Sequence, residues 1–127
     1  MPRIEGACRD VVEKSEWVAI ATTGPSGPHL VATWGAYIRA SGVEGEELII
    51  PAGRYLTTEE NLKLDPRIEL LFASRKVKRE EGRGQGCCVT GKGRVETSGA
   101  TANTLKAKFP WARGALIVTI EHVSAQL

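Results

Sequence analysis

The sequence predicts a mainly β protein: an antiparallel β-barrel of six or so strands with Greek-key connections and two or three short helices. Two observations lead to this fold class. Apolar runs of strand length recur along the chain, at residues 17–22, 30–38, 47–50, 68–73, 87–97 and 115–123. Too few helical segments lie between them for a doubly wound parallel sheet. The 127 residues suffice for a single domain, 1–127, with its own core, and we expect the barrel to close and so protect its edge strands.

The first third of the chain is expected to form a helix and a β-hairpin. In residues 2–14 the apolar side chains lie on one stripe, which predicts an amphipathic helix at the end of the sheet. Residues 17–38 contain two strands around a turn of glycine and proline, and neither strand has a polar face. One face must therefore pack on the core, and the other needs cover from a partner subunit, a bound ligand or both. Beside Trp34, small residues such as Ala32 and Ala36 would let a flat ligand approach the backbone.

A third strand and a helix follow. Residues 47–50 form the strand, which we expect to stop at the turn of residues 51–53. Thr57, with Glu60 three residues later, fits a capping box at the start of the helix. Proline after Asp65 ends the helix, because a residue that precedes proline avoids the helical region.

The turn before this helix is a candidate phosphate site. A turn of small residues that leads into a helix presents free backbone N–H groups at the positive end of the helix dipole. Arg54 adds a permanent cation, and Thr57 and Thr58 add hydroxyl donors. The alternative, that Thr57 only caps its helix, stays open because capping threonines are common.

Residues 74–86 are expected to form a charged, glycine-rich loop. Ser74, Arg75 and Lys76 follow directly after a strand and could bind a single phosphate. Nucleic acid is disfavoured because the loop has no aromatic residues for stacking. The glycines at 82–86 have the wrong spacing for a dinucleotide fingerprint. The plainer interpretation is a solvated loop.

The last third of the chain is expected to supply two strands and a short helix. Strand 87–97 contains Gly91 and Gly93, which suggest a β-bulge or a barrel corner. Residues 100–108 predict a helix that ends before a proline. Residues 115–123 predict the final strand.

The composition disfavours several classes of protein. A net charge of +2 is too small to indicate a nucleic-acid binder. The chain has 3 cysteines without C-x-x-C spacing, which indicates reduced thiols in a cytoplasmic protein and no zinc site. His29 and His122 are isolated, so we expect no metal. We also expect neither a signal peptide nor a membrane span, because no apolar run is long enough.

An ordered set of short segments carries a resemblance to a known family. The segments are Val18-Ala19-Ile20-Ala21-Thr22, Gly27-Pro28-His29-Leu30-Val31 with Thr33-Trp34, Thr58-Glu59 with Asn61, Ser74-Arg75-Lys76-Val77, and Trp111-Ala112-Arg113 with Ala115-Leu116. Because these segments occur in the same order and with nearly the same gaps, the chain resembles the FMN-binding split-barrel family, which includes the pyridoxamine 5'-phosphate oxidases. It resembles in particular the small single-domain FMN-binding proteins of anaerobic bacteria. No single segment is diagnostic, but together they cover almost the whole chain.

The resemblance implies a split barrel that forms a homodimer, with one FMN per subunit at or near the interface. It implies that one strand and the following turn contact the flavin ring, that the start of the helix binds the phosphate, and that the C-terminal residue reaches the partner's flavin. The cofactor-binding residues expected from the sequence and the resemblance together are Ala32, Thr33, Trp34, Pro51, Ala52, Gly53, Arg54, Thr57, Thr58, Ser74, Arg75, Lys76, Trp111 and Leu127.

The chain departs from the family pattern at two of these positions. Relatives usually carry a basic residue where this chain has Thr57, and the small FMN-binding proteins carry asparagine where it has Ala32. Loss of a lysine would weaken phosphate binding unless another cation replaces it. We hypothesise that Arg54, three residues earlier, supplies that charge.

The expected function is that of a small flavoprotein, either an electron carrier or a flavin reductase-like oxidoreductase. No residue is identified as a general acid or base, so the catalytic residues, the electron donor and the electron acceptor stay open. Three alternatives remain. They are an enzyme of the same fold that uses FMN to oxidise an amine or reduce a small substrate, a barrel that binds deazaflavin or haem, and a ligand-binding or dimerisation module without redox chemistry.

Overall fold

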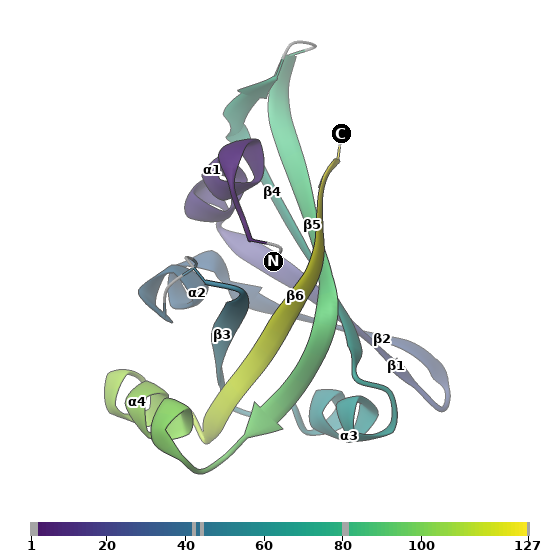
Figure 1. The fold of residues 1–127 in the computed structure, drawn as a ribbon, viewed down its shortest axis with the longest axis vertical. Helices are drawn as coiled ribbons and strands as arrows, with labels where there is room; N and C mark the ends of the chain where they lie inside the picture. The colour runs from purple at the N-terminus through teal and green to yellow at the C-terminus, as the bar shows by residue number, and fades with distance from the viewer. Residues whose placement is uncertain (1–2, 42, 44, 80–81, 127) are drawn as a thin grey trace.

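The computed structural model describes residues 3–41, 43, 45–79 and 82–126 (Figure 1). The described residues form a curled β-sheet with helices at its ends and along its open side. In chain order the elements are α1 (Gly6–Lys14), β1 (Trp17–Gly24), β2 (Gly27–Trp34), α2 (Gly35–Ser41), β3 (Glu47–Ala52), α3 (Leu56–Leu64), β4 (Arg67–Arg79), β5 (Gly82–Glu96), α4 (Ala100–Lys108) and β6 (Gly114–Gln126). The mainly β, antiparallel fold expected from the sequence is confirmed. The described residues contain four helices, where two or three were expected.

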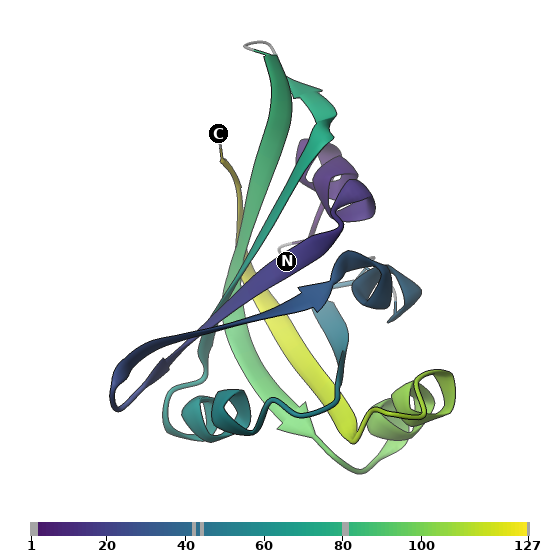
Figure 2. The same ribbon diagram turned by 180° about the vertical axis from the view of Figure 1, so that it is seen from behind.

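The sheet stays open between its first and last strands. Its strand order is β2-β1-β4-β5-β6-β3, with every neighbouring pair antiparallel. The curl of the sheet brings the two edge strands, β2 and β3, onto the same side of the molecule (Figure 2). The expectation of a closed barrel is therefore wrong: among the described residues no ladder joins β2 to β3, and the barrel is split along this line.

The concave face of the sheet holds the core. Strand residues alternate, so that every second side chain of β1 and β4 points inward, as in Val18, Ile20, Leu70 and Phe72, which are fully buried. Helix α1 packs against β4 and β5 and buries the stripe predicted for it. The expected amphipathic helix at the end of the sheet is thus confirmed.

The second strand is shorter than expected. It ends at Trp34, and the chain turns at once into α2, where a continuing strand was predicted to residue 38. Gly35 causes the turn: its N–H donates to the carbonyl of Glu16 at 2.9 Å, and a side chain on Gly35 would collide with the carbonyl of Ser15. This close approach needs glycine and brings Tyr37 of α2 round to the gap between the edge strands.

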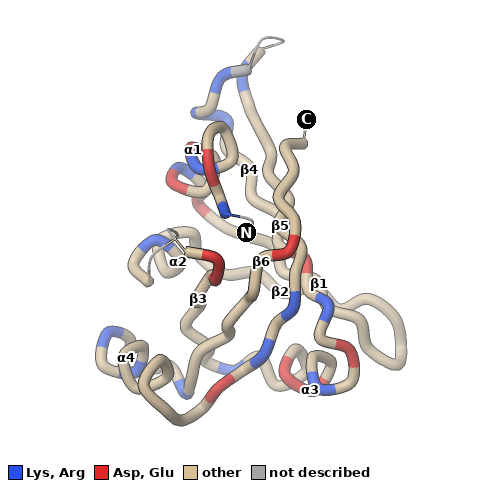
Figure 3. Tube along the Cα trace, viewed as in Figure 1, with Lys and Arg blue, Asp and Glu red and all other residues tan. Residues whose placement is uncertain are grey.

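Residues 74–79 and 82–86, expected to belong to a loop, instead form a long arm of the sheet, and residues 80–81 lie outside the described residues. β4 and β5 continue pairing as far as Arg79 and Gly82, with a register shift between Ser74 and Lys78. Lys and Arg lie along this arm near the top of Figure 3. The prediction failed because solvent-exposed strands can be charged on both faces, so their composition resembles that of a loop.

The bulge suggested by Gly91 is confirmed. The register between β5 and β6 shifts between Thr90 and Gly91, and a side chain on Gly91 would collide with the carbonyl of Thr119. The helix predicted at 100–108 is confirmed as α4, and the last strand, β6, is longer than expected at both ends.

Candidate functional site

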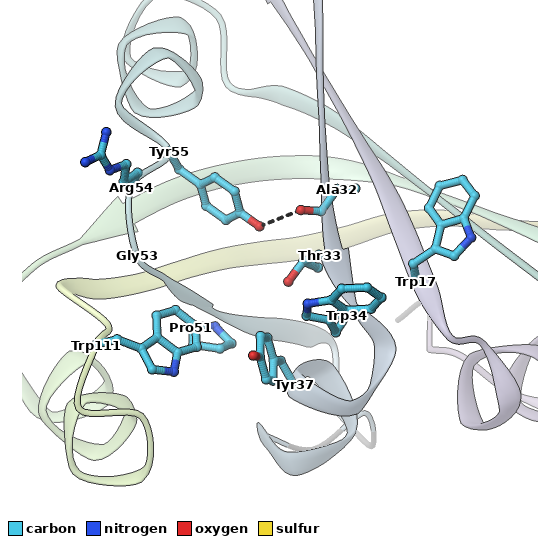
Figure 4. Close-up of a pocket in the computed structure, with 10 residues that line it drawn as sticks. All are labelled: Trp17, Ala32, Thr33, Trp34, Tyr37, Pro51, Gly53, Arg54, Tyr55 and Trp111. Atoms are coloured by element: carbon cyan, nitrogen blue, oxygen red, sulfur yellow. Dashed lines mark hydrogen bonds between the residues drawn. The ribbon is translucent and has the colours of Figure 1, made fainter.

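A cavity of about 310 Å³ opens between the two edge strands of the split barrel. Its walls come from the ends of β1 and β2, from α2, from the end of β3 with the turn that follows, and from the loop after α4 (Figure 4). Trp17, Ala32, Thr33, Trp34, Tyr37, Pro51, Gly53, Arg54, Tyr55 and Trp111 line it. The lining includes all 3 tryptophans and both tyrosines of the chain.

The aromatic side chains form a connected wall. Tyr37 lies against Phe109 and Trp111, with ring centroids 5.3 and 5.2 Å apart, and Phe109 and Trp111 are 5.6 Å apart. These are ordinary separations for tilted and edge-to-face contacts. Trp34 lies across the cavity from Trp111 (Figure 4) and is half exposed, at 53%. A flat, apolar space flanked by rings results.

Gly53 lets Trp111 lie close over the backbone. A β-carbon on Gly53 would lie 3.2 and 3.3 Å from two ring carbons of Trp111. Any side chain there would push the indole aside, so glycine at this position sets how near the ring comes to the turn. The same turn is fixed from behind, because the N–H of Arg113 donates to the carbonyl of Ala52 at 2.8 Å.

Tyr55 bridges the split between the edge strands. Its backbone has φ of 54°, the only non-glycine residue with positive φ among the described residues, which is costly for a bulky side chain. The hydroxyl donates to the carbonyl of Ala32 at 3.4 Å across the gap. Burial raises the pKa of this hydroxyl, and a hydrogen bond with the Thr33 side chain partly offsets the rise. The phenol is therefore neutral at physiological pH and serves as a tether.

The start of α3 differs from the predicted capping box. The N-cap residue is Tyr55, and no side chain caps this end, because Thr57 lies inside the helix and is exposed. Thr58 is fully buried, and its Oγ1 has no hydrogen-bond partner among the described residues. The first turn of α3 thus presents uncapped N–H groups and an unsatisfied hydroxyl, a combination that suits an anion. The Arg54 side chain is exposed and points away from the cavity toward this helix (Figure 4).

The structure brings half of the predicted site residues together. Those that line the cavity are Ala32, Thr33, Trp34, Pro51, Gly53, Arg54 and Trp111. Ala52 is buried behind the turn, and Thr57 and Thr58 lie on α3 next to it. Ser74, Arg75 and Lys76 line a separate hollow at the base of the β4–β5 arm, which shares only Trp17 with the cavity. Leu127 lies outside the described residues.

Three aromatic residues of the cavity were missed from the sequence. Trp17 was taken as a strand residue, Tyr37 was placed on a strand that is in fact a helix, and Tyr55 was part of a turn judged only for its anion-binding groups. A large aromatic residue directly after a Pro-Ala-Gly-Arg turn was the available signal for Tyr55, because turns seldom carry such residues without a packing role.

The cysteines are not arranged as a reactive site. Cys87 is buried and faces Cys8 of α1, while Cys88 points to the other face of β5, as predicted for adjacent strand residues. Burial, together with the hydrogen bond to Cys8, raises the pKa of the Cys87 thiol far above its ordinary value. In the part of the chain that the structure describes, no group of three His, Cys, Asp or Glu could hold a metal ion. No helix there is long and apolar enough to cross a membrane.

A split antiparallel barrel with an aromatic cavity between its edges defines a class of ligand-binding β proteins. Within it, the chain belongs to the pyridoxamine 5'-phosphate oxidase family, whose model matches residues 4–125. A curated relative, the FMN-binding protein of Nitratidesulfovibrio vulgaris (strain DSM 19637 / Miyazaki F), is 37% identical over 123 residues, which cover 97% of each chain. The family resemblance noted in the sequence is confirmed.

Solved structures with much lower identity share the fold. A HupZ variant from Group A Streptococcus superposes with a TM-score of 0.77 at 18% identity, covering 97% of this chain and 99% of that one. A candidate pyridoxamine 5'-phosphate oxidase from Lactobacillus delbrueckii has a TM-score of 0.69 at 17% identity, with coverage of 98% and 99%. Such low identities support the fold and do not transfer a function.

Proposed function

We propose that this protein binds FMN with the flavin ring in the cavity between β2 and β3. The cavity volume of about 310 Å³ is at the lower end of ligand pockets, about 300–1,000 Å³, so it suits a flat ring whose chain extends outside. Trp34 and Trp111 offer apolar faces for stacking. The small residues Ala32 and Gly53 leave backbone groups open to the polar edge of a ring. The relative named as an FMN-binding protein supports this choice of ligand.

The phosphate of FMN would bind at the start of α3. The uncapped N–H groups of the first turn and the hydroxyl of Thr57 would donate to it, with the unsatisfied Thr58 hydroxyl behind them. Arg54 is a candidate cation, since it is exposed on the turn between the cavity and the helix. It would replace the basic residue that relatives carry at the position of Thr57. We expect Arg54→Ala to lower FMN affinity; an unchanged affinity would rule out this role.

The protein would act as a small electron carrier or flavin reductase-like oxidoreductase. Bound FMN supplies one- and two-electron redox chemistry of its ring. The residues that line the cavity include no carboxylate, histidine or thiol among those described. Tyr55 keeps its proton because burial raises its pKa. In this proposal the chain holds the ring, and proton transfer by a dedicated side chain plays no part.

We also propose that the protein works as a cytoplasmic homodimer. Large apolar side chains are exposed on the outer face of the β1–β2 hairpin and β4: Trp17 at 57%, Leu30 at 69%, Trp34 at 53% and Leu71 at 45%. A contiguous exposed apolar surface next to a ligand cavity is typical of an interface. A second copy of the chain would cover it and would bring new residues to the rim of the cavity. Leu30→Glu should give a monomer in light scattering; a dimer of unchanged stability would place the interface elsewhere.

The aromatic cavity between two unpaired edge strands carries the proposal. The test is to purify the protein, record its visible absorption spectrum and titrate the colourless form with FMN. We expect a flavin spectrum and one FMN per chain. A deazaflavin or haem spectrum would identify a different cofactor in place of FMN. A colourless protein that does not bind added FMN would overturn the proposal.

A further inference from the structure

An arginine outside the cavity holds the turn that leads into α3. Arg113 lies directly before β6, and its guanidinium reaches back over the turn after β3. Its Nε and Nη2 donate to the carbonyl of Arg54 at 3.0 and 2.6 Å, and the same Nη2 donates to the Glu59 carboxylate at 2.7 Å. One side chain thus joins the backbone of the turn to the first turn of the helix.

This arrangement places a carboxylate close to the proposed phosphate site. Glu59 belongs to the first turn of α3, and side chains of a helix tilt toward its N-terminus. Because one nitrogen of Arg113 contacts both groups, the carboxylate must lie near the carbonyl of Arg54. The Glu59 and Arg113 side chains are only 19% and 31% exposed, so solvent screens their charges poorly. A second cation, Lys63, is farther from Glu59, at 3.8 Å, and exposed.

We propose that Arg113 is a positioning residue for the phosphate group of FMN. It holds the turn of Gly53 and Arg54 in place and neutralises Glu59, which would otherwise repel a dianion at the helix N-terminus. The guanidinium of Arg113 donates to the Arg54 carbonyl and to the Glu59 carboxylate, so in this proposal Arg113 acts through these two residues. This inference rests on the proposed FMN site and adds to it the residue that makes an acidic helix start compatible with phosphate.

Two ligands separate this role from simple support of the fold. FMN and riboflavin share the ring, but only FMN has the phosphate. We expect Arg113→Ala to weaken FMN binding roughly tenfold, because a poorly screened like charge then faces the phosphate. Riboflavin binding should weaken by less than about threefold, since its ring contacts do not involve Glu59. Isothermal titration of both ligands, with urea unfolding as a check on the fold, measures the difference.

A second substitution tests the charge itself. In the Arg113→Ala background, Glu59→Gln removes the carboxylate and should restore most of the lost FMN affinity. Arg113→Lys, which keeps the cation without the forked hydrogen bonds, should retain most of the affinity and covers the case in which the alanine variant does not fold. Arg94→Ala is the matched control: Arg94 of β5 pairs with Glu96 of the same strand at 2.9 Å and with Glu47 of β3 at 3.5 Å, and it does not line the cavity. It should bind FMN like the unaltered protein.

The outcomes are distinct. Equal losses for FMN and riboflavin would mean that Arg113 only supports the cavity, which overturns the inference. Failure of Glu59→Gln to restore FMN binding, or a loss with Arg113→Lys as large as with alanine, would also overturn it. If the unaltered protein does not bind FMN at all, the proposed function fails first, and this inference fails with it.

Discussion

The concave face of the sheet and the gap between its edge strands differ in how completely they bury large apolar side chains. On the concave face, Ile20, Leu70 and Phe72 are completely buried. In the gap, Trp34 and Trp111 remain about half exposed, at 53% and 50%, although tryptophan has more apolar surface to bury than any of them. The core buries its apolar side chains completely, whereas the gap leaves aromatic rings exposed. The difference indicates that the rings in the gap need cover from a ligand, from a second copy of the chain or from both.

Polar groups show the same contrast. The buried Asn61 side chain donates to the Thr22 hydroxyl at 3.1 Å, so this pair in the core is satisfied. Beside the gap, the Thr58 hydroxyl on α3 has no hydrogen-bond partner among the described residues, and Tyr55 has a left-handed backbone. Unsatisfied groups and backbone strain concentrate at functional sites because stability alone would remove them. Substitutions in the two regions should therefore differ in their effects on the free energy of unfolding and on FMN affinity.

The largest effect is expected in the core. Phe72→Ala should lower the free energy of unfolding by about 4 kcal/mol, because it removes a fully buried ring and leaves a cavity. The folded variant should bind FMN with unchanged affinity. Urea unfolding measures the loss, and Leu64→Ala, at an exposed position outside the proposed interface, should cost less than about 1 kcal/mol. A loss below about 1 kcal/mol for Phe72→Ala would contradict this account of the core.

The opposite pattern is expected for Trp34. Trp34→Ala should weaken FMN binding by about 1–3 kcal/mol, the range found for an aromatic ring stacked on a base. The free energy of unfolding should change by less than about 1 kcal/mol, because the indole is half exposed. Leu64→Ala, at an exposed apolar side chain outside the cavity, is the control. A Trp34→Ala variant that is strongly destabilised but binds FMN normally would contradict this prediction.

A single methyl group tests the close approach at the turn. Gly53→Ala should push Trp111 away from the turn and weaken FMN binding roughly three- to tenfold, as overpacking does elsewhere. Gly45→Ala is a matched control, because its nearest contact would be at an ordinary 3.8 Å. Fluorescence titration of each variant with FMN is sufficient. Equal affinities of the two variants would show that the turn has room to spare.

The smallest effect concerns the tether across the split. Tyr55→Phe removes the hydrogen bond to Ala32 and should cost about 1 kcal/mol of stability. The pKa of Tyr55 is raised in the folded state, so its contribution is complete below the unfolded value of about 10 and is lost as pH rises through the folded value. Urea midpoints between about pH 8 and 11 should therefore fall more for the unaltered protein than for Tyr55→Phe. Parallel curves would mean that Tyr55 does not titrate as described.

Local patterns predicted the parts of the fold that depend on local rules. Apolar runs of strand length placed β1, β3 and β6. Gly91 marked a real bulge, and the stripe of α1 was the face that it buries. Each of these features leaves a signal in the local sequence.

The predictions from the sequence were wrong where contacts between distant residues determine the local structure. Gly35 starts a helix because Ser15, twenty residues earlier, approaches its backbone. Thr57 does not cap α3, because Tyr55 occupies the N-cap position and reaches across to Ala32. Residues 74–79 and 82–86 form a strand pair because each side completes the hydrogen bonds of the other. None of these contacts has a signal in local composition.

The tryptophans test the central claim most directly, because all 3 in the chain line the cavity. The measurement is a two-dimensional ¹⁵N–¹H NMR titration with FMN that follows their indole N–H signals. We predict that the signals of Trp34 and Trp111 shift the most, that Trp17 also shifts, and that all three reach saturation at one FMN per chain. Saturable binding of FMN that leaves the indole signals in place would put the ligand elsewhere and contradict the account.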